Sequence, residues 1–95
     1  MPADDLDEIL RSLRQHYAGE LPERMRAIDE ALATGDPQTR SLVHRLHGSA
    51  GSYGFLDVSR AAGHLEEALE AADPEVIARA HTELRDIVKD ALAVS

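Results

Sequence analysis

The sequence predicts an all-α protein, an antiparallel up-and-down four-helix bundle with an additional or kinked N-terminal helix. Ala, Leu, Glu, Arg and Asp dominate the composition, and β-branched residues are few. Apolar residues recur at intervals of three and four, which is the helical period. The breaks between apolar stretches are only a few residues long, as between antiparallel neighbours in a bundle. Because 95 residues can enclose only one core, we expect a single domain spanning residues 1–95.

The N-terminal third carries two apolar stripes separated by Gly19 and Pro22, residues that often end or begin a helix. The sequence leaves open whether this region forms two helices or one kinked helix. The first stripe consists of Leu6, Ile9, Leu10, Leu13 and Tyr17, and the second consists of Leu21, Met25, Ile28 and Leu32.

Three further helices follow, each bounded by turn residues. Gly35-Asp36-Pro37 predicts a stop and a restart, and Gly54 predicts the next break. Asp57 or Ser59 is the expected cap of the following helix, and Asp73, ahead of Pro74, is the expected cap of the last one. The expected core stripes are Leu42, Val43, Leu46, Ala50 and Tyr53, then Val58, Ala62, Leu65 and Leu69, then Ile77, Ala80, Leu84, Ile87 and Ala91.

The composition argues against several classes of function. A formal charge of −8 disfavours nucleic acid and anionic membranes as partners. No apolar run approaches the length of a membrane span, and the N-terminus lacks the basic and apolar regions of a signal peptide. The chain has no Cys to form a disulfide, a thiolate nucleophile or a sulfur-ligated metal site. We therefore expect a cytoplasmic protein, and we expect it to be a monomer.

The charges are unevenly distributed, because the segment 37–56 contains no Asp or Glu. The same segment contains Arg40, His44, Arg45 and His47. This locally electropositive strip suits a group that becomes negative, although a solvated face without a function would look the same.

Helical spacing places His44, His47, Gly48 and Gly51 on one face, beside the expected core seam. A glycine inside a helix costs roughly 0.5–1 kcal/mol relative to Ala, so two on this face need a reason. For Gly48 we favour access, because the missing side chain lets another protein approach the imidazole of His44. For Gly51 the sequence leaves access, close helix packing and fraying open.

The next helix supplies a candidate partner for His44. If the two helices form an antiparallel hairpin that turns near Gly54, Glu66 lies opposite His44. A carboxylate on one ring nitrogen fixes the tautomer and leaves the other nitrogen with an outward lone pair, which makes histidine a nucleophile. The alternative is that Glu66, near Glu67 and Glu70, is an ordinary exposed residue.

The run from His44 to Phe55, His-Arg-Leu-His-Gly-Ser-Ala-Gly-Ser-Tyr-Gly-Phe, followed by Leu65-Glu66, resembles the signature of histidine-containing phosphotransfer (HPt) domains. Such domains also occur at the front of chemotaxis histidine kinases. The resemblance extends over about 23 contiguous positions, residues 44–66, and the helical pattern of the rest fits the family's bundle. It implies that His44 is the phosphorylated histidine, Gly48 the small residue that admits the partner, and Glu66 the hydrogen-bond partner of His44.

The resemblance implies a phosphoryl carrier of a two-component phosphorelay. The expected partners are the receiver domain of a response regulator, a histidine kinase, or both. We expect no enzyme activity of its own and no cofactor, because the chain has no Gly-rich phosphate loop with a Lys. Any Mg²⁺ should belong to the partner, because carboxylates do not cluster around His44 in the sequence.

His47 departs from the family, which usually has Lys there to hold the phosphoryl group. Because histidine is charged only part of the time near neutral pH, Arg40 or Arg45 is an alternative supplier of positive charge. The sequence leaves two other functions open. One is a metal-binding helical bundle that uses His44, His47 and Glu66 as ligands, and the other is a purely structural interaction bundle.

Overall fold

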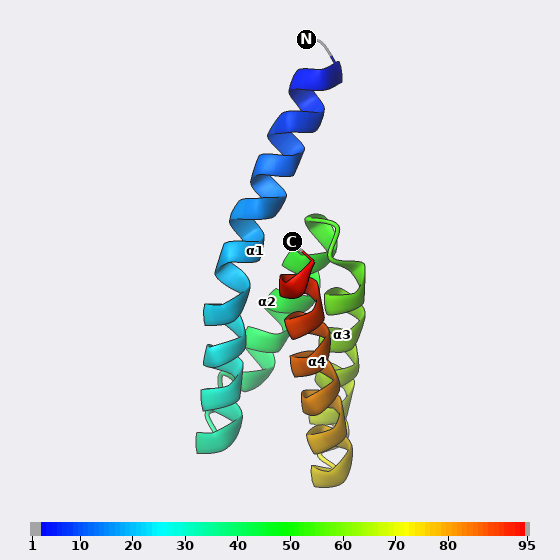
Figure 1. Ribbon diagram of the computed structural model, residues 1–95. Helices are drawn as coiled ribbons and strands as arrows, with labels where there is room; N and C mark the ends of the chain where they lie inside the picture. Colours follow the sequence, from blue (N-terminus) through cyan, green and yellow to red (C-terminus); the bar gives the residue numbers. More distant parts are fainter. Residues whose placement is uncertain (1–2, 95) are drawn as a thin grey trace.

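A computed structural model describes residues 3–94, with side chains from residue 5 onward, as four α-helices without a strand in that range (Figure 1). Helix α1 spans Ala3–Thr34, α2 Thr39–Ser52, α3 Leu56–Ala71 and α4 Pro74–Ala93. Each helix packs against the next, and α1 closes the bundle against α4. The prediction of an all-α four-helix bundle is confirmed.

The N-terminal region is one continuous helix, so the open question between two helices and one is settled. Helix α1 runs through both Gly19 and Pro22. A proline inside a helix removes a backbone hydrogen bond and costs about 3 kcal/mol. The neighbouring Ala18, Leu21 and Met25 are buried in the core, and their packing holds the helix together across the proline. Tertiary burial thus outweighs the local signals for a break.

The helices end at the expected turns at all three connections, and Gly54, with a φ of 85°, lies between α2 and α3. Gly35 follows α1 with a φ of 67°, a conformation that glycine adopts without strain. The side chain of Asp73 accepts hydrogen bonds from the backbone N–H groups of Glu75 and Val76 at 3.0 and 3.4 Å, and Pro74 occupies the first turn of α4.

The predicted cap of α3 is wrong. The helix begins one residue before Asp57, its cap position is Phe55, and no side chain caps it. Asp57 lies in the first turn, where its negative charge interacts favourably with the positive end of the helix dipole. The hydroxyl of Ser59 instead donates to the backbone oxygen of His47 on α2, at 2.7 Å. It therefore joins two helices rather than capping one.

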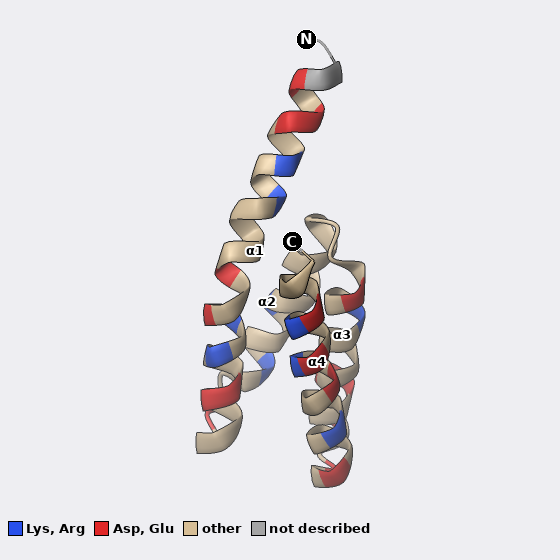
Figure 2. Cartoon of the chain, in the orientation of Figure 1, with Lys and Arg blue, Asp and Glu red and all other residues tan. Residues whose placement is uncertain are grey.

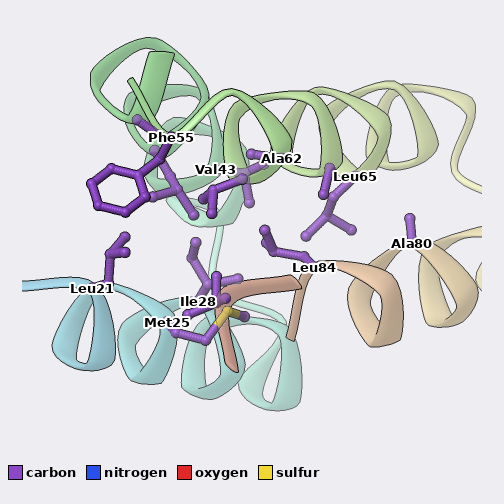
Figure 3. Packing of buried hydrophobic residues seen from close by; sticks show 14 of the residues in the cluster. Leu21, Met25, Ile28, Val43, Phe55, Ala62, Leu65, Ala80 and Leu84 are labelled. Atoms are coloured by element: carbon purple, nitrogen blue, oxygen red, sulfur yellow. The ribbon is translucent and has the colours of Figure 1, made fainter. Parts of the chain in front are cut away.

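All four helices contribute apolar side chains to one core, and Figure 3 shows these side chains pointing toward one another. The predicted stripes of α2, α3, α4 and the second half of α1 are buried or half-buried, except for Tyr53, which is exposed. The buried cluster consists of Tyr17, Ala18, Leu21, Met25, Ile28, Val43, Leu46, Ala50, Phe55, Val58, Ala61, Ala62, Leu65, Ala68, Ala80, Leu84 and Val88.

Tyr17 marks the end of the core nearest the N-terminus. Its ring stacks on Tyr53, with centroids 4.6 Å apart, and lies 5.8 Å from the Phe55 ring. Its hydroxyl is 2.6 Å from the Ser49 hydroxyl on α2, so the polar end of this buried residue is satisfied. These contacts tie α1 to α2 and to the α2–α3 turn.

The first apolar stripe was predicted to belong to the core, and for four of its five residues this is wrong. Leu6, Ile9, Leu10 and Leu13 are 44–55% exposed, and only Tyr17 is buried. At about 1.5 Å per residue, α1 is more than twice as long as α2. The N-terminal half of α1 therefore projects beyond the other three helices (Figure 1), and the molecule extends 50 × 21 × 18 Å. We call residues 5–16 the overhang.

Two glycines should respond oppositely to alanine. At Gly19 a Cβ would meet nothing within 4 Å, so Gly19→Ala should raise the free energy of unfolding by roughly 0.5–1 kcal/mol. At Gly35 the space is also open, but a residue with a Cβ is strained at this positive φ. Gly35→Ala should therefore lower the free energy of unfolding by roughly 1–2 kcal/mol. Urea melts of both variants measure the difference. A destabilised Gly19→Ala variant would contradict a continuous helix there.

Candidate functional site

The exposed face of α2 carries an accessible histidine. The side chain of His44 is 73% exposed, whereas Val43 and Leu46 point into the core from the other side of the same helix. Helix α2 has two arginines and no acidic residue, and Figure 2 marks the charged residues of the chain by colour. An imidazole here meets solvent on a locally basic surface of an anionic protein.

Glu66 on α3 contacts both histidines of α2. Its Oε2 is 2.8 Å from Nδ1 of His44, and its Oε1 is 3.2 Å from Nδ1 of His47. His44 and Glu66, placed opposite each other by the sequence argument, thus lie in contact. An ionised carboxylate can only accept, so Nδ1 is the donor in each pair. The proton on Nδ1 leaves Nε2 of a neutral His44 with its lone pair.

The electrostatics of this cluster favour a charged carboxylate. Partial burial acts to raise the pKa of Glu66, whose side chain is 24% exposed. The hydrogen bonds and positive charges of His47 and His44 act in the opposite direction and together prevail, so the pKa of Glu66 lies below its usual range. Glu66 therefore stays negative across the neutral pH range.

His47 is held against α3 by two contacts that the sequence argument did not single out. A Cβ on Gly63 would lie 3.1 Å from Cε1 of His47, so the imidazole packs directly on the backbone of that glycine. The Ser59 hydroxyl binds the His47 carbonyl oxygen. A signal existed, because Gly63 is a mid-helix glycine three residues before Glu66 and so shares its helix face.

The two glycines of α2 differ in their surroundings. A Cβ on Gly48 would meet nothing within 4 Å, so the surface one turn beyond His44 is open. A Cβ on Gly51 would lie 3.1 Å from Oγ and 3.6 Å from Cβ of Ser59. Of the alternatives for Gly51, this geometry favours close packing of α2 on α3.

Arg40 and Arg45 are exposed on α2, and neither forms an ion pair within the part of the chain that the structure describes. Arg40 lies one turn before His44, on the same helix face, whereas Arg45 is rotated by about 100°. The structure therefore brings His44, His47 and Glu66 together and leaves both arginines at the edge of the cluster.

A metal site receives no support from this geometry. Across the described residues, no group of three or more His, Asp or Glu side chains is arranged to hold a metal ion. The physical reason lies in the orientation of the two imidazoles. Each one directs Nδ1 at a different oxygen of the same carboxylate, which is a hydrogen-bonding arrangement.

An accessible imidazole, fixed at one nitrogen and free at the other, is a nucleophile suited to carrying a transferred group. Comparison with known families specifies the group. The family model described as Hpt domain matches residues 4–93, and the chain belongs to that family. Membership implies a phosphotransfer role in two-component phosphorelays and interaction with response-regulator or kinase partners. No curated protein and no solved structure gives a significant match. Within the described residues, no helix is long and apolar enough to cross a membrane.

The lowered pKa of Glu66 makes its contribution to stability dependent on pH. That contribution is complete above the pKa of the unfolded chain, 4.5, and is lost as pH falls through the lower folded value. Glu66→Gln should therefore reduce the free energy of unfolding by about 1 kcal/mol or less near pH 6, and by nothing once both states are protonated. Chemical denaturation over this pH range measures the difference. Glu67→Gln, on an exposed neighbouring residue, is the control, and a Glu66 effect that does not change with pH would contradict the assignment.

Proposed function

We propose that this chain is a phosphoryl carrier that accepts the phosphoryl group on Nε2 of His44 and exchanges it with an Asp of a receiver domain. A histidine kinase is a second possible donor. The contact between Nδ1 of His44 and Glu66 is the observation that carries the proposal, because it leaves Nε2 as the nucleophilic atom on an exposed side chain. We also propose that the chain acts in the cytoplasm and has no enzymatic activity of its own.

The transfer step balances without a further reactant from this chain. The lone pair of Nε2 attacks the phosphorus of an aspartyl phosphate, and the N–P bond forms as the bond from phosphorus to the Asp carboxyl oxygen breaks. The aspartate leaves as a carboxylate. The His44 ring then carries a proton on Nδ1, a phosphoryl group on Nε2 and a positive charge. The reverse step returns the phosphoryl group to an aspartate.

Glu66 supports both ends of this step. Its carboxylate holds the Nδ1 proton in place before transfer and stabilises the positive ring after it. His47 binds the other oxygen of the same carboxylate, and in its protonated form it adds positive charge near the phosphoryl group. Arg40 and Arg45 contribute to the basic surface on which the phosphate arrives.

The shape of α2 supports docking of a large partner. In-line attack requires the receiver's phosphorylated Asp to reach Nε2, so the surface next to His44 must admit a loop of another protein. The open space at Gly48 provides this access. A side chain there would stand between His44 and the partner.

The phosphorylated residue can be mapped with receiver domains from the same genome, phosphorylated beforehand on Asp. We expect His44→Gln to abolish transfer to the chain, because the attacking nitrogen is gone, and His47→Gln to retain it. Mass spectrometry at neutral pH, which preserves phosphohistidine, locates the group. Circular dichroism provides the folding control for both variants. Labelling that survives in His44→Gln and disappears in His47→Gln would move the site by one turn and overturn the proposal.

Gly48→Gln separates access from folding. The added side chain has open space and improves helix propensity, so the free energy of unfolding should stay equal or rise by up to roughly 1 kcal/mol. Transfer from the receiver should slow by at least about tenfold, because hindered docking needs to raise the activation free energy by only about 1.4 kcal/mol to have that effect.

Gly19→Gln is the matched control, because Gly19 is also an exposed mid-helix glycine with nothing within 4 Å of a Cβ. It should leave transfer unchanged. Equal transfer rates in the two variants would rule out the access role of Gly48.

A further inference from the structure

The overhang of α1 presents an apolar face that the rest of the described chain leaves uncovered. Leu6, Ile9, Leu10 and Leu13 follow the spacing i, i+3, i+4 and i+7, which places them together on one side of the helix. They are 50%, 44%, 55% and 46% exposed, respectively. A helical segment of this length is marginal in water unless its apolar face packs on something. We therefore expect another apolar surface to cover this face.

The charges beside this face have a direction. The acidic Asp5, Asp7 and Glu8 lie in the half nearer the N-terminus, and Arg11 and Arg14 lie in the half nearer the bundle. Figure 2 shows this order along α1, with red preceding blue. Two parallel overhangs would set acid against acid and arginine against arginine. Two antiparallel overhangs would set the acids of each against the arginines of the other.

The pattern is compatible with two-fold symmetry in its details. A set of positions i, i+3, i+4 and i+7 maps onto itself when the helix direction is reversed about its centre, so an antiparallel copy faces Leu6 with Leu13 and Ile9 with Leu10. Asp7 and Arg14, seven residues apart, lie on the same side of the stripe. In this register Asp7 of one copy lies two residues, about 3 Å along the axis, from the level of Arg14 of the other, within reach of the long arginine side chain, twice per pair. The Arg14 guanidinium also lies over the Phe55 ring of its own chain, 4.7 Å from the ring centroid. The same surface thus fits itself, as an isologous interface requires.

We propose that a second copy of this chain covers the overhang, forming an antiparallel two-fold dimer through residues 5–16. The expectation of a monomer, which rested on the sequence alone, did not foresee that four large apolar side chains lie outside the bundle. The stripe also leads into a groove of about 510 Å³ beside the bundle, lined by Leu10, Leu13 and Tyr53, which offers the second helix further apolar contact.

The dimer surface and the phosphorelay site are separate. The overhang precedes Tyr17, which contacts Ser49 and Tyr53 at the far end of α2 from Arg40. The hydrogen bonds and ion pairs of His44, His47 and Glu66 join these three side chains to one another and not to residues 5–16. The proposal does not depend on the proposed function, and each can fail without the other.

Sedimentation velocity of the full chain, from low micromolar to about 1 mM, tests for association. We expect a reversible monomer–dimer equilibrium, consistent with a small interface. Leu6→Ser combined with Leu10→Ser should raise the dissociation constant at least tenfold while leaving the thermal melt of the bundle intact, because both side chains lie outside the core. A chain that stays monomeric to about 1 mM would overturn the proposal and assign the stripe to a different partner. So would a double variant that dimerises as well as the wild type.

Charge reversal tests the antiparallel orientation. Asp7→Lys alone and Arg14→Glu alone should each weaken self-association, because each creates like-charged pairs across the two-fold axis. An equimolar mixture of the two variants should recover association, because every pair across the axis is again opposite in charge. In a parallel dimer, position 7 faces position 7, so neither reversal would change the pairing of like with like. Single variants that associate as the wild type does would therefore overturn the antiparallel dimer.

Discussion

The close packing of α2 against α3 is the constraint on which the site depends. Small residues line this contact on both sides, with Gly51 against Ser59 and Gly63 under the ring of His47. Buried Ala61 and Ala62 keep the core side of the same contact thin. Because the two helices approach so closely, one glutamate side chain spans the gap and reaches two imidazoles. Larger side chains at this contact would separate the carboxylate from the histidines without altering either.

Much of this arrangement could be predicted from the sequence, because it depends on local signals and regular periodicity. Asp73 before Pro74 and the break at Gly35 mark helix ends in the chain and in the structure. The pairing of His44 with Glu66 follows from counting across a short antiparallel turn. The contact of His47 with the same carboxylate was harder to foresee, since it needs the rotation of α3 that sets Gly63 beneath the imidazole.

The errors share a physical cause, which is that local sequence does not record what covers a helix. Gly19 and Pro22 resemble a boundary, yet burial of their neighbours keeps α1 continuous. Leu10 and Leu21 belong to apolar stripes with the same helical spacing, yet only Leu21 lies opposite other helices. The spacing alone does not distinguish them. Likewise, Ser59 has the chemistry of a helix cap and is used as a cross-link between helices.

Because α1 is continuous, the orientation of the overhang is set by the part of the same helix that packs in the bundle. Burial of Tyr17 and Leu21 fixes the rotation of α1 about its own axis relative to the bundle. Because the helix is continuous before them, the direction in which each residue of the overhang faces around that axis is fixed as well. One residue added between Leu13 and Tyr17 would rotate the apolar stripe by about 100° around the helix axis. Seven added residues would move the stripe about 10 Å farther from the bundle and leave it facing in nearly the same direction around the axis. The length of this segment thus sets the direction and distance at which anything held by the stripe stands from His44.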